Sequence, residues 1–312
     1  MRELSRGAWA ELIALALALS SATLPAQTAY KYRDSSGQWV FTDQAPAAAA
    51  RSDSFSVGHE NDALHLSVDR SDAGGSTQLI AVNDCLCVVT FEIAIQQSDI
   101  AAIPNGTGYR ATLPPGTRQI MAQADTGSTK AGLRYVWRAA LGSPDAVHKP
   151  SRPYRVPFDV GSSYVVSQAY PSQITHTTPD SQYAVDIALP DGTPVYAARE
   201  GTVINARHDF FRGATAPVMF DQANVIEILH DDGTIGLYAH LRWDSIRVRI
   251  GAHVARGQYI ADSGNTGFSS GPHLHFAVIR NAGTADVSVP IQFAGIADTG
   301  VTPETQMPLT SY

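Results

Sequence analysis

The sequence of 312 residues is poor in cysteine, in charge and in long apolar runs, and each shortage excludes a class of protein. Charged residues make up only 16% and apolar residues 44%, so the chain is not a disordered polyelectrolyte. Its 22 basic and 29 acidic residues leave a net charge of −7 without a basic stripe, so no nucleic acid is expected as a partner. A mean hydropathy of −0.09 argues against a protein with several membrane spans. We expect a core-forming protein of two or three domains.

Only two cysteines are present, Cys85 and Cys87, so disulfides cannot provide a framework for the fold. A disulfide across the single residue Leu86 is geometrically unfavourable. The neighbouring sequence also lacks the partners that a Cys-x-Cys metal site would need. We expect two small buried residues that can form a labile disulfide, with the metal site as the alternative.

The N-terminal segment, residues 1–26, has the layout of a secretory signal peptide. Arg2 and Arg6 precede an apolar run from Leu12 to Leu19, and small or turn-forming residues lead to a cleavage position after Ala26. The run is shorter than the ~20 residues of a membrane-spanning helix, and an uncut anchor is the alternative. We therefore expect a periplasmic or secreted protein with no stable membrane span after signal cleavage.

The remainder of the chain is predicted to be mainly β. Its expected parts are a hairpin module with an Ala-rich linker (27–57), a β-sandwich-like domain (60–145), a linker (146–157), an antiparallel β domain (158–292) and a C-terminal tail (293–312). The hairpin module has two aromatic-rich runs around Ser36-Gly37 and is similar to a small N-terminal module of exported bacterial proteins. The sandwich-like region has regular short strands and almost no converging acids, bases or nucleophiles. A structural or recognition role is expected for it.

The sharpest local signal is the pair His273 and His275. Gly271-Pro272 precedes the pair and the apolar run Phe276–Ile279 follows it, which predicts a strand that begins there. Side chains alternate along a strand, so both imidazoles would share one face while Leu274 points into the core. Such a pair suits a metal, although a solvated pair on a strand is the preferred explanation of these two residues taken alone.

Three further residues strengthen the metal interpretation. Asp186 lies in the apolar run Tyr183–Ala188, where a carboxylate needs compensation by an ion pair or a metal. With His176 and one imidazole of the later pair it could supply the three protein ligands of a catalytic zinc, which leave a fourth position for water. His240 ends a predicted strand in Leu237-Tyr-Ala-His-Leu and could be either a catalytic or a surface residue.

In this order, these motifs resemble the LytM/lysostaphin-type zinc metallopeptidase domain, peptidase family M23. The matching segments are the run from Tyr183 to Val203, Leu237-Tyr-Ala-His240-Leu, Ser263-Gly-Asn-Thr-Gly and Gly271-Pro-His273-Leu-His275-Phe. The resemblance covers roughly residues 160–285, and four ordered motifs make it more specific than the histidine pair alone. It implies that the C-terminal antiparallel β domain is a LytM-like peptidase that follows a β-sandwich-like module.

The resemblance also implies a role for each candidate. The implied zinc ligands are His176, Asp186 and His275. The implied catalytic pair, without a bond to the metal, is His240 and His273. Zinc would activate a water molecule and polarise the scissile carbonyl. One imidazole of the pair would accept the proton of the water and the other would stabilise the oxyanion, with the division between them left open. Tyr170 is an additional candidate for an oxyanion donor.

A second aspartate competes for the ligand position. The commonest spacing in the family is His-x-x-x-Asp, which His176 and Asp180 also satisfy. We assign the ligand to Asp186, because the aspartate of the family precedes a Gly-Thr-Pro-Val segment. Asp180 follows Pro179 in a polar stretch that indicates a loop insertion.

The resemblance implies hydrolysis of the peptide stems or cross-links of bacterial peptidoglycan, and export agrees with that location. D-Ala–diaminopimelate cross-links are the first choice, although the sequence does not decide the bond, and protein partners are unknown. One alternative is a catalytically inactive LytM-like module that binds cell wall or activates amidases. Another is a structural zinc protein, which would need a fourth protein ligand.

Overall fold

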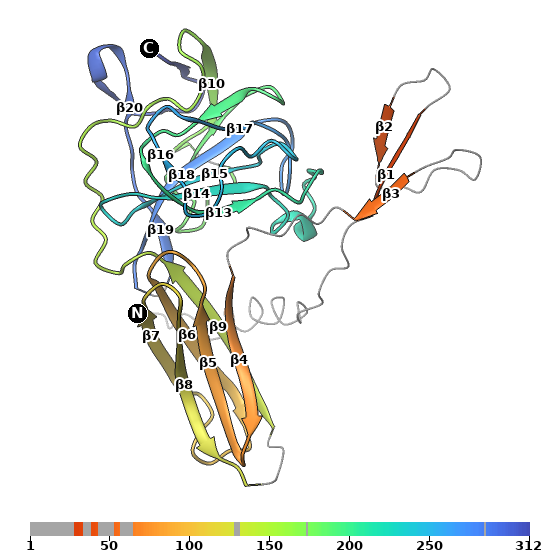
Figure 1. Cartoon of the computed structure of the whole chain (residues 1–312). Coiled ribbons are helices and arrows are strands. Elements are labelled where there is room, and N and C mark those ends of the chain that lie inside the picture. Colours follow the sequence, from red (N-terminus) through yellow and green to blue (C-terminus); the bar gives the residue numbers. More distant parts are fainter. Residues whose placement is uncertain are drawn as a thin grey trace, which may run out of the picture. The chain divides into compact units, whose positions relative to one another are not determined.

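The computed structural model describes residues 28–33, 39–42, 53–56, 65–127, 132–172, 174–283 and 285–312. The chain divides into two compact units, Met1–Glu60 and Asn61–Tyr312. Nearly all regular structure in the described residues is β-strand, which confirms the predicted mainly β class (Figure 1). None of the helices in these ranges has the length and apolar character needed to cross a membrane. The predicted signal peptide, residues 1–26, lies outside the described residues.

The described part of the first unit is a three-stranded antiparallel sheet in the order β2-β1-β3. Its strands are β1 (Thr28–Arg33), β2 (Trp39–Thr42) and β3 (Asp53–Ser56). The first two correspond to the aromatic-rich runs on either side of Ser36-Gly37. The third lies in the segment that its alanine content marks as a linker, and its backbone pairs with β1 with Phe55 opposite Ala29.

The second unit begins with a β-sandwich of two three-stranded sheets, β4-β5-β8 and β7-β6-β9. The strands are β4 (Leu66–Ala73), β5 (Ser76–Asn83), β6 (Val89–Ser98), β7 (Gly108–Leu113), β8 (Thr117–Asp125) and β9 (Leu133–Leu141). Alternate side chains of the paired strands fill one core, in which Leu79, Phe91 and Ile93 are fully buried.

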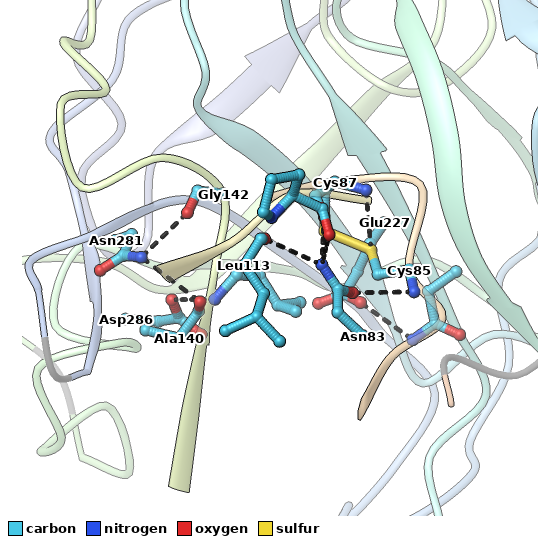
Figure 2. Close-up of a disulfide and its surroundings, with 12 residues drawn as sticks. Asn83, Cys85, Cys87, Leu113, Ala140, Gly142, Glu227, Asn281 and Asp286 are labelled. Carbon is cyan, nitrogen blue, oxygen red and sulfur yellow. Dashed lines mark hydrogen bonds between the residues drawn. A yellow bond between two sulfur atoms is a disulfide. The ribbon is translucent and has the colours of Figure 1, made fainter. Parts of the chain in front are cut away.

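The two cysteines lie in the loop between β5 and β6 and form a disulfide (Figure 2). The apolar run from Cys85 predicts strand from that residue, but the observed strand begins only at Val89. The side chain of Asn83 accounts for the difference. It accepts a hydrogen bond from the backbone N–H of Cys85 at 3.0 Å and donates to the carbonyl of Cys87 at 3.0 Å. These bonds close a local turn, and both cysteines are buried within it.

The rest of the second unit is built on one nine-stranded antiparallel sheet. The path is β16-β13-β14-β15-β18-β11-β10-β22, and β19 also pairs with β18. Its strands are β10 (Ser163–Gln168), β11 (Val185–Ile187), β13 (Gly201–Arg207), β14 (Val225–Leu229), β15 (Ile235–Ala239), β16 (His253–Val254), β18 (Leu274–Asn281), β19 (Asp286–Ser288) and β22 (Pro308–Thr310).

Two short ribbons accompany this sheet. They are β12 (Pro194–Tyr196) with β17 (Tyr259–Asp262), and β20 (Phe293–Ala294) with β21 (Gly300–Val301). The segment predicted as a C-terminal tail thus contributes three strands, and β22 forms an edge of the main sheet beside β10.

The central strands of the main sheet are apolar on both faces, because each face packs on a different core. Along β18, Phe276 and Val278 enter the core of the peptidase-like domain, while Ala277 and Ile279 enter the core of the sandwich. This is the alternation that a strand buried on both sides requires. The sandwich and the large sheet therefore share apolar packing and are not joined only by a linker.

Polar groups complete the junction between sandwich and sheet (Figure 2). The buried side-chain amide of Asn281 donates to the carbonyls of Ala140 and Gly142 at 3.3 and 2.9 Å. The backbone N–H of Leu141 donates to Oδ1 of Asp286 at 3.0 Å. Burial, and then the nearby carboxylate of Glu227, raise the pKa of Asp286 to about 7. The junction therefore holds a carboxyl group that resists ionisation.

Replacing Asp286 with asparagine is expected to stabilise the protein at pH 8. The pKa of Asp286 is about 7 in the fold, well above the ~4 of an unfolded aspartate, so the wild type loses stability as the pH rises from about 4 to about 7. Asparagine keeps an acceptor for Leu141 and removes the charge. We expect a gain of about 1–2 kcal/mol at pH 8, discounted for the partial exposure of the group, and little change at pH 4.

Urea denaturation of Asp286→Asn and wild type at pH 4 and pH 8 measures this difference. The exposed Asp84, in the sandwich loop, offers Asp84→Asn as the control with no expected pH-dependent gain. An equal effect of Asp286→Asn at both pH values would contradict a buried carboxyl with a raised pKa.

Candidate active site

The candidate residues lie close together because three adjacent strands of the main sheet, β11, β18 and β15, pair at the end where these residues are located. Asp186 on β11 lies opposite His275 on β18, which lies opposite Ala239 on β15. His240 is the next residue after β15, and its backbone turns with φ 62° in the left-handed region. His273 lies just before β18 and forms a bridge with Gly264. Pairing of strands thus brings together residues that are far apart in the sequence.

Three of the candidates form a compact group of donor atoms. One ligand atom from each of His176, Asp186 and His275 lies within 4.8 Å of the other two. Oδ1 of Asp186 is 3.2 Å from Nε2 of His176 and 2.9 Å from Nδ1 of His275. The competing aspartate, Asp180, is exposed and is not a member of this group.

Hydrogen bonds on the outer side hold these donors in place. Nδ1–H of His176 donates to the carbonyl of Ala184 at 3.1 Å, which leaves the lone pair of Nε2 directed at Asp186. Gln168, which pairs with Asp186 across β10 and β11, donates to Oδ2 of that carboxylate at 2.8 Å. Such partners orient metal ligands in known sites. The sequence alone does not single out Gln168, because its only signal is a polar residue at the end of a strand.

The chemistry of the group fits a divalent metal ion. A neutral imidazole with its lone pair 3.2 Å from a carboxylate oxygen leaves two acceptors facing each other unless a cation or a proton lies between them. Ligands of a tetrahedral zinc, at 2.0–2.2 Å from the ion, lie about 3.3–3.6 Å from one another. Although burial opposes the charge of Asp186, the neighbouring imidazoles of His176 and His275 hold its pKa well below the usual value. The carboxylate is therefore available as an anionic ligand.

The other two imidazoles lie beside this group as a pair. The ring centroids of His240 and His273 are 4.5 Å apart. Nδ1–H of His240 donates to the carbonyl of Thr266 at 2.6 Å, and Nδ1–H of His273 donates to the carbonyl of Gly271 at 2.8 Å. Each ring therefore keeps the lone pair of Nε2 as an acceptor.

Both rings are close to the metal-ligand group. Nε2 of His273 lies 3.9 Å from Oδ1 of Asp186, and the ring of His240 meets that of His275 edge to face. Burial, and next the neighbouring His273, lower the pKa of His240 to about 3, so the ring is neutral at physiological pH. Two imidazoles beside the donor group, each with Nδ1 engaged by a backbone carbonyl, have Nε2 left to accept and return protons.

The remaining candidate from the sequence, Tyr170, is 45% exposed, and its ring packs against Tyr183 at 4.8 Å between centroids. Another histidine of the domain, His230, is buried and donates to the carbonyl of Glu200 at 2.7 Å, which gives it a structural contact.

Two segments of the chain match known families, and the chain is similar to several known proteins. Residues 180–287 match peptidase family M23, and residues 16–62 match a domain of unknown function, DUF4124. The peptidoglycan DD-endopeptidase ShyA of Vibrio cholerae is 39% identical over 94 residues, which are 30% of this chain and 19% of ShyA. Lysostaphin of Staphylococcus simulans is 33% identical over 128 residues, 38% of this chain and 23% of lysostaphin.

Among solved structures, the catalytic domain of lysostaphin from Staphylococcus simulans is 26% identical, with a TM-score of 0.26. That comparison covers 42% of this chain and 82% of the lysostaphin chain. The chain therefore spans about a fifth to a quarter of the two curated relatives and most of this isolated domain. The family match includes Asp186, His240, His273 and His275 and begins four residues after His176. From about residue 180, the chain carries a domain of peptidase family M23, the LytM/lysostaphin type of metallopeptidase.

Proposed function

We propose that the protein is an exported zinc metallo-endopeptidase that hydrolyses peptide stems or cross-links of bacterial peptidoglycan. The observation that carries the proposal is the convergence of His176, Asp186 and His275 beside two further imidazoles. Three protein ligands leave one coordination position for water or substrate, as in catalytic zinc sites, whereas structural sites are closed by four. No cysteine lies in this group, which argues further against a structural site.

Zinc suits the proposed ligands better than other common metals. Two imidazoles and one carboxylate form a mixed nitrogen and oxygen set, while calcium and magnesium select oxygen ligands. When bound, zinc would supply Lewis acidity that activates a water molecule and polarises the scissile carbonyl.

The residues of the chain would move the protons. The Nδ1–H groups of His240 and His273 are held by the carbonyls of Thr266 and Gly271, so Nε2 is the nitrogen of each ring that is left for proton transfer. One imidazole accepts the proton of the attacking water at Nε2 and later passes the same proton to the leaving amine, which returns that imidazole to its starting state. The other imidazole stabilises the developing oxyanion when it carries a proton taken from the solvent, which it returns after the peptide bond is broken. Both imidazoles are held in the same way, so their geometry does not decide which is the base and which stabilises the oxyanion.

The names of the relatives support the substrate. ShyA is named as a peptidoglycan DD-endopeptidase, and a relative from Staphylococcus capitis as a glycyl-glycine endopeptidase. We therefore propose peptidoglycan peptides as the substrate, with D-Ala–diaminopimelate cross-links as the first choice. A periplasmic or secreted location follows from that substrate and from the signal-like segment 1–26.

Zinc quantification with a digestion assay on purified sacculi tests this function. The zinc-loaded protein is expected to release soluble peptide fragments, and removal of the metal by a chelator should stop the release until zinc is restored. Protein that holds stoichiometric zinc and releases no fragment from sacculi or from cross-linked peptides would favour the non-enzymatic LytM-like module instead.

A further inference from the structure

A cleft opens beside the catalytic pair, with a volume of about 640 Å³. Four segments form it: a turn at Asp191, a loop from Phe211 to Met219, Arg242-Trp243 and Asn265-Thr266. The last two segments adjoin the catalytic pair directly. Arg242 follows His240 by two residues, and the carbonyl of Thr266 accepts the hydrogen bond from Nδ1–H of His240. A ligand in this cleft would therefore lie next to the reacting groups.

Close approach of two loops shapes the cleft. Gly213 forms a parallel bridge with Gly267, and a Cβ on Gly213 would lie 2.2 Å from the carbonyl oxygen of Asn265. Only glycine permits that approach without displacing the backbone. The loop 211–219 is thus held against the loop that carries Asn265 and Thr266, so the cleft is formed before any ligand binds.

The charged residues that line the cleft are Arg212, Arg242 and Asp191. Arg242 is the one that lies closest in sequence to the catalytic pair. Arg242 is exposed, and among the described residues no ion pair or side-chain hydrogen bond engages its guanidinium. Nη1 of Arg242 lies 3.1 Å from the place that a Cβ on Gly192 would occupy, so the group extends over the turn at the rim of the cleft.

One of the residues that line the cleft, Asn265, has an unpartnered acceptor. Oδ1 of Asn265 is buried, and it has no hydrogen-bond partner among the residues that the structure describes. Buried polar atoms without a partner are rare in folded proteins and call for an explanation, such as a ligand that supplies the missing group. This oxygen would accept an N–H group. A guanidinium and a free amide oxygen together match the carboxylate and the N–H that a C-terminal amino-acid residue presents.

We propose that the cleft is a specificity subsite for a free carboxylate on the residue next to the scissile bond, and that Arg242 is its main determinant. The inference rests on the proposed peptidase function and narrows it to a substrate class. A D-Ala–diaminopimelate cross-link carries such a carboxylate on the carbon attached to the scissile nitrogen, and so does a stem that ends in D-Ala–D-Ala. A glycine bridge carries none.

Matched peptides test the subsite in the zinc-loaded protein. One pair is a cross-linked D-Ala–diaminopimelate peptide with a free carboxylate or a carboxamide after the scissile bond. The second pair is a stem ending in D-Ala–D-Ala or in its carboxamide. We expect kcat/KM to be at least about tenfold higher for the free carboxylate, since charged hydrogen bonds are worth that factor or more. The two pairs of peptides show whether the carboxylate recognised is that of a cross-link or that of a stem terminus. Equal cleavage rates for the carboxylate and the carboxamide in both pairs would overturn the proposal.

Variants of Arg242 identify the residue responsible. Arg242→Gln is expected to reduce the preference for the carboxylate to within about twofold, and Arg242→Lys to restore part of the preference. Arg118→Gln, at an arginine that is 68% exposed in the sandwich, is the matched control and should keep the full preference. A preference that survives Arg242→Gln would exclude Arg242 as the determinant.

Binding of the same peptides, measured by calorimetry on the zinc-loaded protein, separates this proposal from the proposed function. Protein that binds the carboxylate peptide at least about tenfold more tightly than the carboxamide, yet cuts neither, would retain the subsite and disprove the peptidase. Protein that cuts both peptides without discrimination would retain the peptidase and disprove the subsite. Asn265→Ala is expected to weaken binding of both peptides, because both keep the N–H group that Oδ1 would accept.

Discussion

Replacing His275 with alanine is expected to abolish metal binding and peptide hydrolysis together. His275 provides one of three donors that lie within 4.8 Å of one another, and Asp186 lies 2.9 Å from its Nδ1. Two remaining protein ligands cannot hold zinc at the affinity of a catalytic site. We expect the zinc content to fall from about one ion per chain to near zero, and kcat/KM on cross-linked peptides to fall by at least about a thousandfold. Elemental analysis and the digestion assay measure the two losses separately.

His253→Ala is the control for this variant, because His253 is exposed on β16 and takes no part in the donor group. It should keep both zinc and activity. Circular dichroism shows whether His275→Ala is folded, which matters because its strand also packs in both cores. A folded His275→Ala protein with full zinc content would contradict the assigned ligand set.

The two aspartates give a second matched comparison. Asp186→Asn should lose zinc, since it replaces an anionic ligand that Gln168 orients at 2.8 Å. Asp180→Asn alters an exposed residue outside the donor group and should leave zinc content unchanged. The opposite result would transfer the ligand role to Asp180.

The sequence predicts the inner parts of the site because each carries a local signal. Asp186 lies in an apolar run, and the residues around His273 and His275 have the period of a strand. The structure brings Asp186 and both histidines to one end of the sheet. A carboxylate amid apolar residues is costly without a partner, so its presence alone indicates a compensating group.

The surroundings of the site could not be predicted in the same way, because they depend on contacts between distant segments. Gln168 becomes meaningful only when β10 pairs with β11. The apolar run that contains Ala277 and Ile279 predicts one buried strand. No local pattern in it shows that the sandwich covers these two side chains. Likewise β22 has only three residues and two of them are Pro308 and Thr310, so nothing in its composition marks it as an edge of the main sheet.

Replacing His240 with alanine is expected to separate catalysis from metal binding. His240 is not in the donor group, so the variant should retain zinc, whereas the loss of a proton-transferring imidazole should lower kcat by about 10²–10⁴-fold. The backbone of His240 has φ 62°, which is unfavourable for alanine and better tolerated by asparagine. His240→Asn therefore serves as the companion variant, since it removes the imidazole with less backbone strain.

Both His240 variants should show the same loss of kcat if the imidazole performs proton transfer, and His273→Ala should resemble them in keeping zinc. If His240→Asn kept wild-type activity while His240→Ala lost it, the role of His240 would be to hold the chain in its left-handed turn and to bind the carbonyl of Thr266 at 2.6 Å. Because the metal is retained in each case, the pH profile of kcat can be compared between the His240 and His273 variants. The histidine whose loss removes the rise of activity with pH is the general base, since a base must be unprotonated to accept the proton of water.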